Sequence, residues 1–134
     1  MKTSTQKFSA LASVLVFMAS LLFVQCDMNG VKDVEVSSED FLETIAQDKL
    51  TMIDFYTTWC GPCKQMDPHV KKVKEEHQEF NIIQVDAEAQ MSIAGRYNIR
   101  AYPTVMLFKK GEVVFRSEGA LNEEQILSLL NQYK

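Results

Sequence analysis

Two cysteines separated by two residues form the chemical centre of this sequence. Cys60 and Cys63 follow an apolar segment and precede a polar one with helical spacing. At a helix N-terminus, unpaired backbone N–H groups and the helix dipole stabilise a thiolate and lower the pKa of the cysteine. We therefore predict that Cys60 attacks a disulfide as a thiolate. Cys63, one turn further in and more buried, is predicted to remain a thiol and to resolve the mixed disulfide.

Other uses of this cysteine pair fit the sequence less well. A disulfide across two residues closes too small a loop to restrict the unfolded chain, which disfavours a structural role. Zinc and iron–sulfur centres normally need four ligands. His69 and His77 lie eight residues apart and do not share a helix face well. We therefore expect no metal and no cofactor, and a redox-silent binding domain would not require the cysteines.

Neighbouring residues favour the same chemistry. Asp54 interrupts an apolar segment typical of a buried strand, so its pKa should be raised, and it is predicted to accept the proton of Cys63 through water. A solvated aspartate at a strand end is the alternative. Trp59 offers a flat apolar surface to a substrate, although a core tryptophan would leave the same pattern. Gly61 allows a substrate backbone to approach closely, and Pro62 suits the first turn of a helix.

The first 25 residues differ from the rest of the chain. Lys2 and Lys7 precede an apolar run at 8–24, 17 residues long and interrupted only by serines. This pattern is typical of an export signal or a membrane anchor. Residues 22–26 look like a loose bacterial lipobox, so Cys26 is predicted to carry lipid, with an uncleaved anchor or a cleaved signal as alternatives. The folded part would then lie on the periplasmic side of the membrane, in an oxidising space.

A polar tether at 26–32 leads to one predicted domain at 33–134. We expect a short strand at 34–36 and a helix capped by Ser37, with Phe41, Leu42 and Ile45 as its apolar stripe. A strand at 50–57, a helix from Cys60 towards residue 80, a strand at 81–85 and a helix at 89–97 follow. Strands at 104–108 and 113–115 form a hairpin, and Asn122 caps a last helix. This order predicts an α/β fold with a mixed sheet, part parallel and part antiparallel hairpin, flanked by helices.

The composition agrees with one globular domain. Of the 134 residues, 46% are hydrophobic and 24% charged, with a net charge of −4. A nucleic-acid partner is disfavoured because the chain has no basic excess. We expect a monomer.

Several segments together resemble the thioredoxin family. Residues 53–64, which read Ile-Asp-Phe-Tyr-Thr-Thr-Trp-Cys-Gly-Pro-Cys-Lys, are similar to that family's active-site stretch. Residues 97–104 are similar to the segment that ends in its cis-proline, and residues 108–113 to its hairpin. The resemblance covers roughly Val31 to the C-terminus. It implies a thioredoxin fold and a redox-active Cys60–Cys63 pair that exchanges disulfides with protein substrates.

The resemblance also implies a substrate groove. Pro103 would follow a cis peptide bond and lie against the cysteine pair, and the groove would be lined by Trp59, Tyr102, Pro103, Gly119 and Ala120. The sequence departs from the family at two of its positions. Tyr102 is bulkier than the usual residue before the cis-proline, and Gln84 stands where the family often has a buried lysine near its acidic residue.

The direction of the reaction is predicted from the residues between the cysteines. The Gly-Pro dipeptide resembles that of reducing thioredoxins, which favours a reductase acting on exported proteins. Such a reductase needs electrons from a membrane thiol carrier. An extracytoplasmic oxidase or isomerase on the same scaffold is the alternative.

Overall fold

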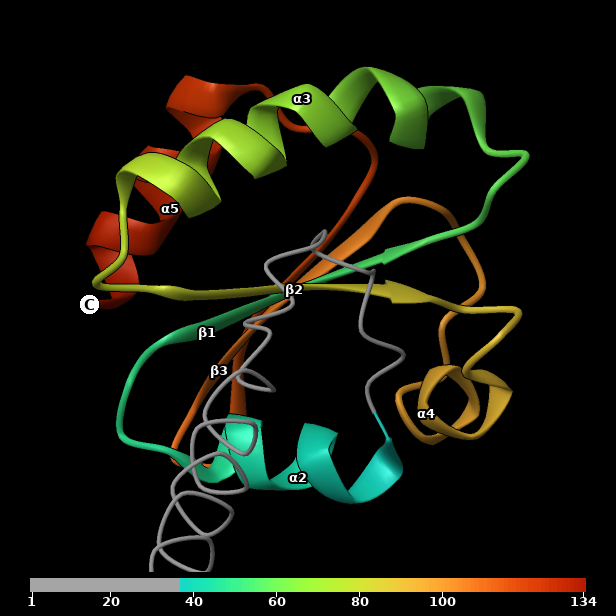
Figure 1. Cartoon of the computed structure of the whole chain (residues 1–134), viewed down its shortest axis with the longest axis horizontal. Helices are drawn as coiled ribbons and strands as arrows, with labels where there is room; N and C mark the ends of the chain where they lie inside the picture. The colour runs from blue at the N-terminus through green and yellow to red at the C-terminus, as the bar shows by residue number, and fades with distance from the viewer. Residues whose placement is uncertain (1–36) are drawn as a thin grey trace, which may run out of the picture. The chain divides into compact units, whose positions relative to one another are not determined.

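The computed structural model describes residues 37–134, which form one sheet covered by helices on both faces (Figure 1). The elements in chain order are α2 (Ser38–Ala46), β1 (Thr51–Tyr56), α3 (Gly61–Glu76), β2 (Asn81–Asp86), α4 (Met91–Arg96), β3 (Thr104–Lys109), β4 (Glu112–Glu118) and α5 (Glu123–Tyr133). The predicted strand at 34–36, the tether, the apolar run at 8–24 and Cys26 lie outside the described residues. Within residues 37–134, no helix has the length and apolar character needed to cross a membrane.

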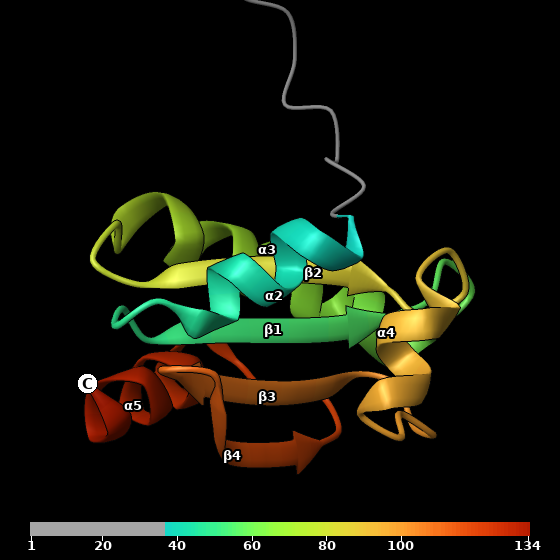
Figure 2. The ribbon, with the colours of Figure 1, turned by 90° about the horizontal axis from the view of Figure 1, so that it is seen from below.

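The sheet has the strand order β2-β1-β3-β4 (Figure 2). β1 pairs with β2 in parallel, and the pairs β1–β3 and β3–β4 are antiparallel. The predicted mixed sheet is therefore confirmed. The register places the ends of β1, β2 and β4 and the start of β3 at one edge, where Tyr56 pairs with Asp86 and Thr104 pairs with Phe55 and Glu118. We call this side of the sheet the loop edge, because the loops at 57–60, 87–90, 97–103 and 119–122 gather there.

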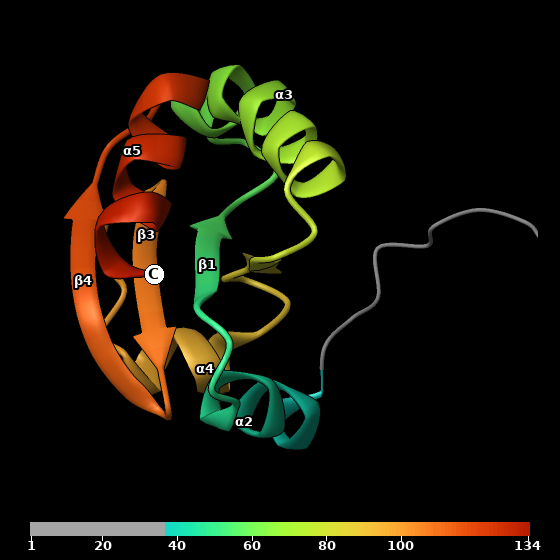
Figure 3. The ribbon, with the colours of Figure 1, turned by 90° about the vertical axis from the view of Figure 1, so that its left-hand side faces the viewer.

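The helices form two layers (Figure 3). α3 and α5 cover one face of the sheet, and α2 and α4 cover the other. Each face has its own apolar core, and alternate residues of β1 enter different cores: Met52 joins the α3/α5 side, whereas Ile53 and Phe55 join the α2/α4 side. Side chains alternate along a strand, so Asp54 points with Met52 toward the α3 side.

Most predicted boundaries agree with the structure within a few residues. The side chain of Ser37 caps α2 and that of Asn122 caps α5, as predicted, and Gln125 completes a capping box with Asn122. α3 continues through Pro68 and ends at Glu76, earlier than predicted, while β4 extends beyond the predicted 113–115.

Two predictions about helices need correction. Leu42 is not part of the buried stripe of α2, because it lies about 100° around the helix from Phe41 and is 38% exposed. α4 spans only Met91–Arg96 and not 89–97, since Ala89 remains in the turn after β2 and Tyr97 is the C-cap.

Candidate active site

The cysteine pair forms a disulfide at the start of α3, on the loop edge. Cys60 is the N-cap of α3, and its Sγ accepts a hydrogen bond of 3.1 Å from the backbone N–H of Cys63. Gly61 and Pro62 occupy the first turn and are exposed. After reduction, the same N–H group and the helix dipole favour a thiolate on Cys60.

The expectation that Cys63 is the more buried cysteine is wrong. Cys60 is 4% exposed and Cys63 is 6% exposed, because each sulfur of the disulfide covers the other. The two cysteines differ in backbone position and not in burial. Cys60 lies at the end of the helix, where orphan N–H groups converge, and Cys63 lies within it.

Asp54 is a buried carboxyl group directed toward the α3 side of the sheet. It is 2% exposed, so its burial is confirmed and a solvated aspartate at a strand end is excluded. Burial raises the pKa of Asp54 to about 6, although a hydrogen bond from Gln84 acts in the opposite direction. Its Oδ2 accepts that bond at 3.2 Å, and its Oδ1 has no hydrogen-bond partner within the described residues. A carboxyl group in this state can exchange a proton near neutral pH.

Trp59 lies on the surface, so the alternative of a core tryptophan is wrong. Its side chain is 65% exposed and packs edge-to-face with Tyr102, with ring centroids 5.9 Å apart. Its indole N–H donates a hydrogen bond of 3.0 Å to Oε1 of Glu88. Glu88 was not found from the sequence, because only the pairing of β1 with β2 brings the two loops together.

The peptide bond between Tyr102 and Pro103 is cis, as the family resemblance implied. The carbonyl of Pro103 accepts a hydrogen bond of 2.9 Å from the N–H of Gly119. Gly119 has a φ of +99°, which disfavours residues with a Cβ, and Ala120 follows it as an exposed residue. The structure thus places all the predicted groove residues on the loop edge.

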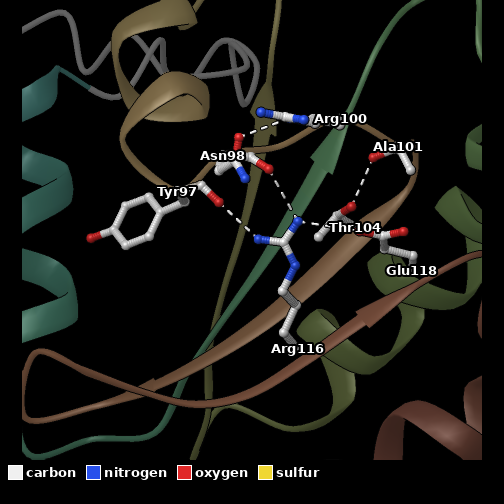
Figure 4. Close-up of polar contacts among 7 residues, drawn as sticks. All are labelled: Tyr97, Asn98, Arg100, Ala101, Thr104, Arg116 and Glu118. Atoms are coloured by element: carbon white, nitrogen blue, oxygen red, sulfur yellow. Dashed lines mark hydrogen bonds and ion pairs between the residues drawn. The ribbon is translucent and has the colours of Figure 1, made fainter.

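Arg116 of β4 holds the loop that leads to the cis-proline (Figure 4). Its guanidinium donates to the carbonyls of Tyr97 at 2.7 Å and Asn98 at 3.2 Å, at the C-terminal end of α4. The same group forms an ion pair of 3.2 Å with Glu118. No local sequence pattern indicates this role, because the bonds join residues 18 and 19 positions apart.

Further contacts fix the same loop. Asn98 adopts a left-handed φ of +52°, and its Oδ1 accepts a hydrogen bond of 2.9 Å from Nε of Arg100 (Figure 4). The hydroxyl of Thr104 donates to the carbonyl of Ala101 at 2.7 Å. The conformation before Pro103 is therefore determined by bonds at both ends of the loop.

His69 lies within α3, and His77 lies at the opposite end of this helix from the cysteine pair. His77 is the C-cap of α3 and lies 3.4 Å from Glu79. Among residues 37–134, no group of three or more His, Cys, Asp or Glu side chains is arranged to hold a metal ion.

The chemistry available at the loop edge is the exchange of a disulfide with a pair of thiols, which defines the class as thiol–disulfide oxidoreductases. The family model described as "Thioredoxin" matches residues 32–132, and the chain belongs to that family. It is a thioredoxin-like disulfide oxidoreductase, and membership of the family implies disulfide-containing substrates.

Individual relatives agree with this assignment. The chain is 39% identical over 95 residues to mitochondrial thioredoxin-2 of Schizosaccharomyces pombe, covering 71% of each sequence. It is 34% identical to the thioredoxin of Chlamydia trachomatis, covering 74% of this chain and 96% of the relative. The solved structure of Fasciola hepatica thioredoxin matches with a TM-score of 0.69 and 29% identity, over 75% of this chain and 97% of that one. The thioredoxin fold is thereby established.

Proposed function

We propose that this protein reduces disulfide bonds of exported proteins. The observation that carries the proposal is the Cys60-Gly61-Pro62-Cys63 sequence at the start of α3, with the N–H of Cys63 directed at the sulfur of Cys60. The Gly-Pro dipeptide is typical of reducing thioredoxins. The apolar run at 8–24 supports export of the domain.

The proposed reaction proceeds in two exchanges. The Cys60 thiolate attacks a substrate disulfide, forms a mixed disulfide and releases one substrate sulfur as a thiolate, which takes a proton from solvent. Cys63 then passes its proton through water to Asp54 and attacks Cys60 Sγ. This step expels the second substrate thiolate and leaves the Cys60–Cys63 disulfide. Two electrons pass to the substrate, and a membrane dithiol carrier restores them to the protein.

Substrate binding is assigned to the groove on the loop edge. Trp59 supplies an exposed aromatic surface, and the half-buried Tyr102 packs edge-to-face against it. The backbone before Pro103 would pair with an extended substrate segment, and Gly119 and Ala120 would border it. The disulfide of a partly unfolded exported protein is the substrate class that we propose for this surface.

The test of direction is the reduction potential of the Cys60–Cys63 pair in the full-length protein. The protein is equilibrated with dithiothreitol or glutathione buffers, and free thiols are trapped and counted. A potential near about −270 mV, as in reducing thioredoxins, is expected. A potential above about −200 mV would overturn the reductase proposal in favour of an oxidase or isomerase.

The anchor is proposed to be a lipid on Cys26. Labelling of the full chain with a radioactive fatty acid in bacterial cells, followed by separation of membranes, tests this proposal. Label on the wild-type chain but not on Cys26→Ser is the expected result. A membrane-bound but unlabelled chain would identify an uncleaved anchor, and an unlabelled, released chain would identify a cleaved signal.

A further inference from the structure

One amide group connects the buried Asp54 to the helix that carries the cysteines. Nε2 of Gln84 donates to Oδ2 of Asp54 at 3.2 Å and to Oδ1 of Asp67 at 3.1 Å. Gln84 lies in β2, directly opposite Asp54 in the register of the sheet. Asp67 lies on α3 four residues after Cys63, so the two share one face of the helix.

Asp67 is a charged carboxylate at the edge of the buried region. Its Oδ2 forms an ion pair of 2.8 Å with Lys71, and its side chain is 37% exposed. Partial burial opposes ionisation of Asp67, but the hydrogen bonds and charge of Lys71 and Gln84 prevail and lower its pKa. Asp67 therefore remains ionised across the pH range in which Asp54, with a pKa of about 6, gains and loses its proton.

The other groups that the structure describes around Asp54 are apolar or neutral, so the charge of Asp67 affects the ionisation of Asp54. β3 places Val105 opposite Asp54, and the apolar core on the α3/α5 side of the sheet includes Val105 together with Ile126 and Leu130 of α5. From β2 comes the neutral Gln84. From α3 comes Asp67 with its partner Lys71. Within residues 37–134, the charge that acts on the ionisation of Asp54 is that of Asp67.

Asp67 and Gln84 act on Asp54 in opposite directions. A hydrogen bond from Gln84 stabilises the ionised carboxylate, and a second negative charge nearby destabilises it. Because Gln84 uses one nitrogen for both bonds, Asp67 also fixes the orientation of the amide that holds Asp54. A neutral amide cannot pass a proton between the two carboxyl groups, so Asp67 acts through charge and geometry.

We propose that Asp67 is a positioning residue for the resolving step: through Gln84 it orients Asp54, and its charge makes Asp54 the stronger proton acceptor for Cys63. This inference rests on the proposed role of Asp54 in the thiol–disulfide cycle. Asp67 itself touches neither the substrate nor the reacting sulfurs in this assignment.

The experiment is a titration of the Asp54 carboxyl carbon by NMR in the oxidised full-length protein. Asp67→Asn keeps the shape and removes the charge, and it is expected to lower the titration midpoint by on the order of half a pH unit. Gln84→Leu removes the stabilising hydrogen bond and should move the midpoint upward. Glu75→Gln, an exposed carboxylate change elsewhere on α3, serves as the control and should leave the midpoint in place.

A second readout separates positioning from a merely structural role. The acid limb of the pH profile for disulfide reduction should move to lower pH in Asp67→Asn, in step with the NMR midpoint. An unchanged midpoint in Asp67→Asn would overturn the inference, as would a shift of equal size in Glu75→Gln. The NMR titration does not depend on the direction of electron flow. If the reductase proposal is wrong, the reduction potential will show it, and the NMR midpoints will be unaffected.

Discussion

The indole N–H of Trp59 donates a hydrogen bond of 3.0 Å to Glu88, although the two residues lie 29 positions apart in the chain. The bond joins the loop before the cysteine pair to the loop after β2. It restrains the orientation of an exposed aromatic ring. The same ring packs edge-to-face on Tyr102, so three loops of the loop edge meet at Trp59.

Removal of the Glu88 carboxylate is expected to loosen Trp59 and weaken substrate binding. In Glu88→Ala, the KM for a protein disulfide should rise about two- to fivefold, equivalent to the about 0.5–1 kcal/mol of one exposed hydrogen bond. Steady-state kinetics with insulin as the substrate and the fluorescence anisotropy of the single tryptophan check this. Glu88→Gln retains an acceptor and should remain near wild type. Equal KM values for Glu88→Ala and the wild type would contradict the prediction.

Loss of the guanidinium of Arg116 is expected to release the loop before Pro103. Arg116→Met leaves the carbonyls of Tyr97 and Asn98 without these donors, and we expect a loss of about 1–2 kcal/mol in unfolding free energy. KM should rise more than kcat falls, because in the proposed function this loop binds substrate and does not carry the reacting sulfurs.

Hydrogen exchange provides the structural check on Arg116. Amides at 97–103 should exchange faster in Arg116→Met, whereas Arg96→Met, a change at an exposed arginine of α4, should leave them protected. Unaltered exchange in this loop would mean that the other bonds around Asn98 and Thr104 hold it without Arg116.

The residues found from the sequence are those whose signal is local. The spacing of Cys60 and Cys63 predicts a redox-active pair. The apolar residues on both sides of Asp54 predict a buried carboxyl group. The cis bond before Pro103 was predicted from resemblance to a family and not from a local pattern of residues. The pattern of residues around it fits a proline at the start of any strand.

The residues that were missed act through long-range contacts. Glu88, Asp67 and Arg116 are charged residues that any solvated surface would carry, and their partners are 17 to 29 positions away. Only the strand register and the packing of α3 on the sheet bring these partners together. The relative burial of Cys60 and Cys63 was mispredicted for a related reason, because the disulfide makes the two sulfurs share one buried volume.

The buried charge of Asp54 is expected to cost stability at neutral pH. Its folded pKa of about 6 exceeds the ordinary value of 3.8, so the folded state holds the proton more tightly than the unfolded chain. Stability should therefore fall as pH rises from about 4 through 6, and the penalty is complete above that range. The difference corresponds to about 3 kcal/mol as an upper bound.

Asp54→Asn tests this linkage. The oxidised variant should be more stable than the wild type by about 1–3 kcal/mol at pH 8 and no more stable at pH 4. Urea unfolding at both pH values measures the difference. Asp48→Asn, a change at an aspartate whose side chain is 79% exposed, should give the same stability as the wild type at each pH. A gain for Asp54→Asn that is equal at pH 4 and pH 8 would rule out titration of Asp54 as the cause.

Trapped intermediates are expected to show which cysteine attacks the substrate disulfide and which resolves the mixed disulfide. Cys60 is the N-cap of α3, and its Sγ accepts a hydrogen bond from the backbone N–H of Cys63. This position favours the thiolate form of Cys60 over that of Cys63. Cys63→Ser should accumulate a mixed disulfide between Cys60 and its substrate, because nothing resolves it, and turnover should fall by at least about a hundredfold. Cys60→Ser should lose turnover equally but trap little substrate. Non-reducing gels and mass spectrometry of the linked peptides identify the attacking sulfur. Substrate trapped mainly on Cys63 would reverse the assignment and show that position on the helix does not decide which thiol attacks.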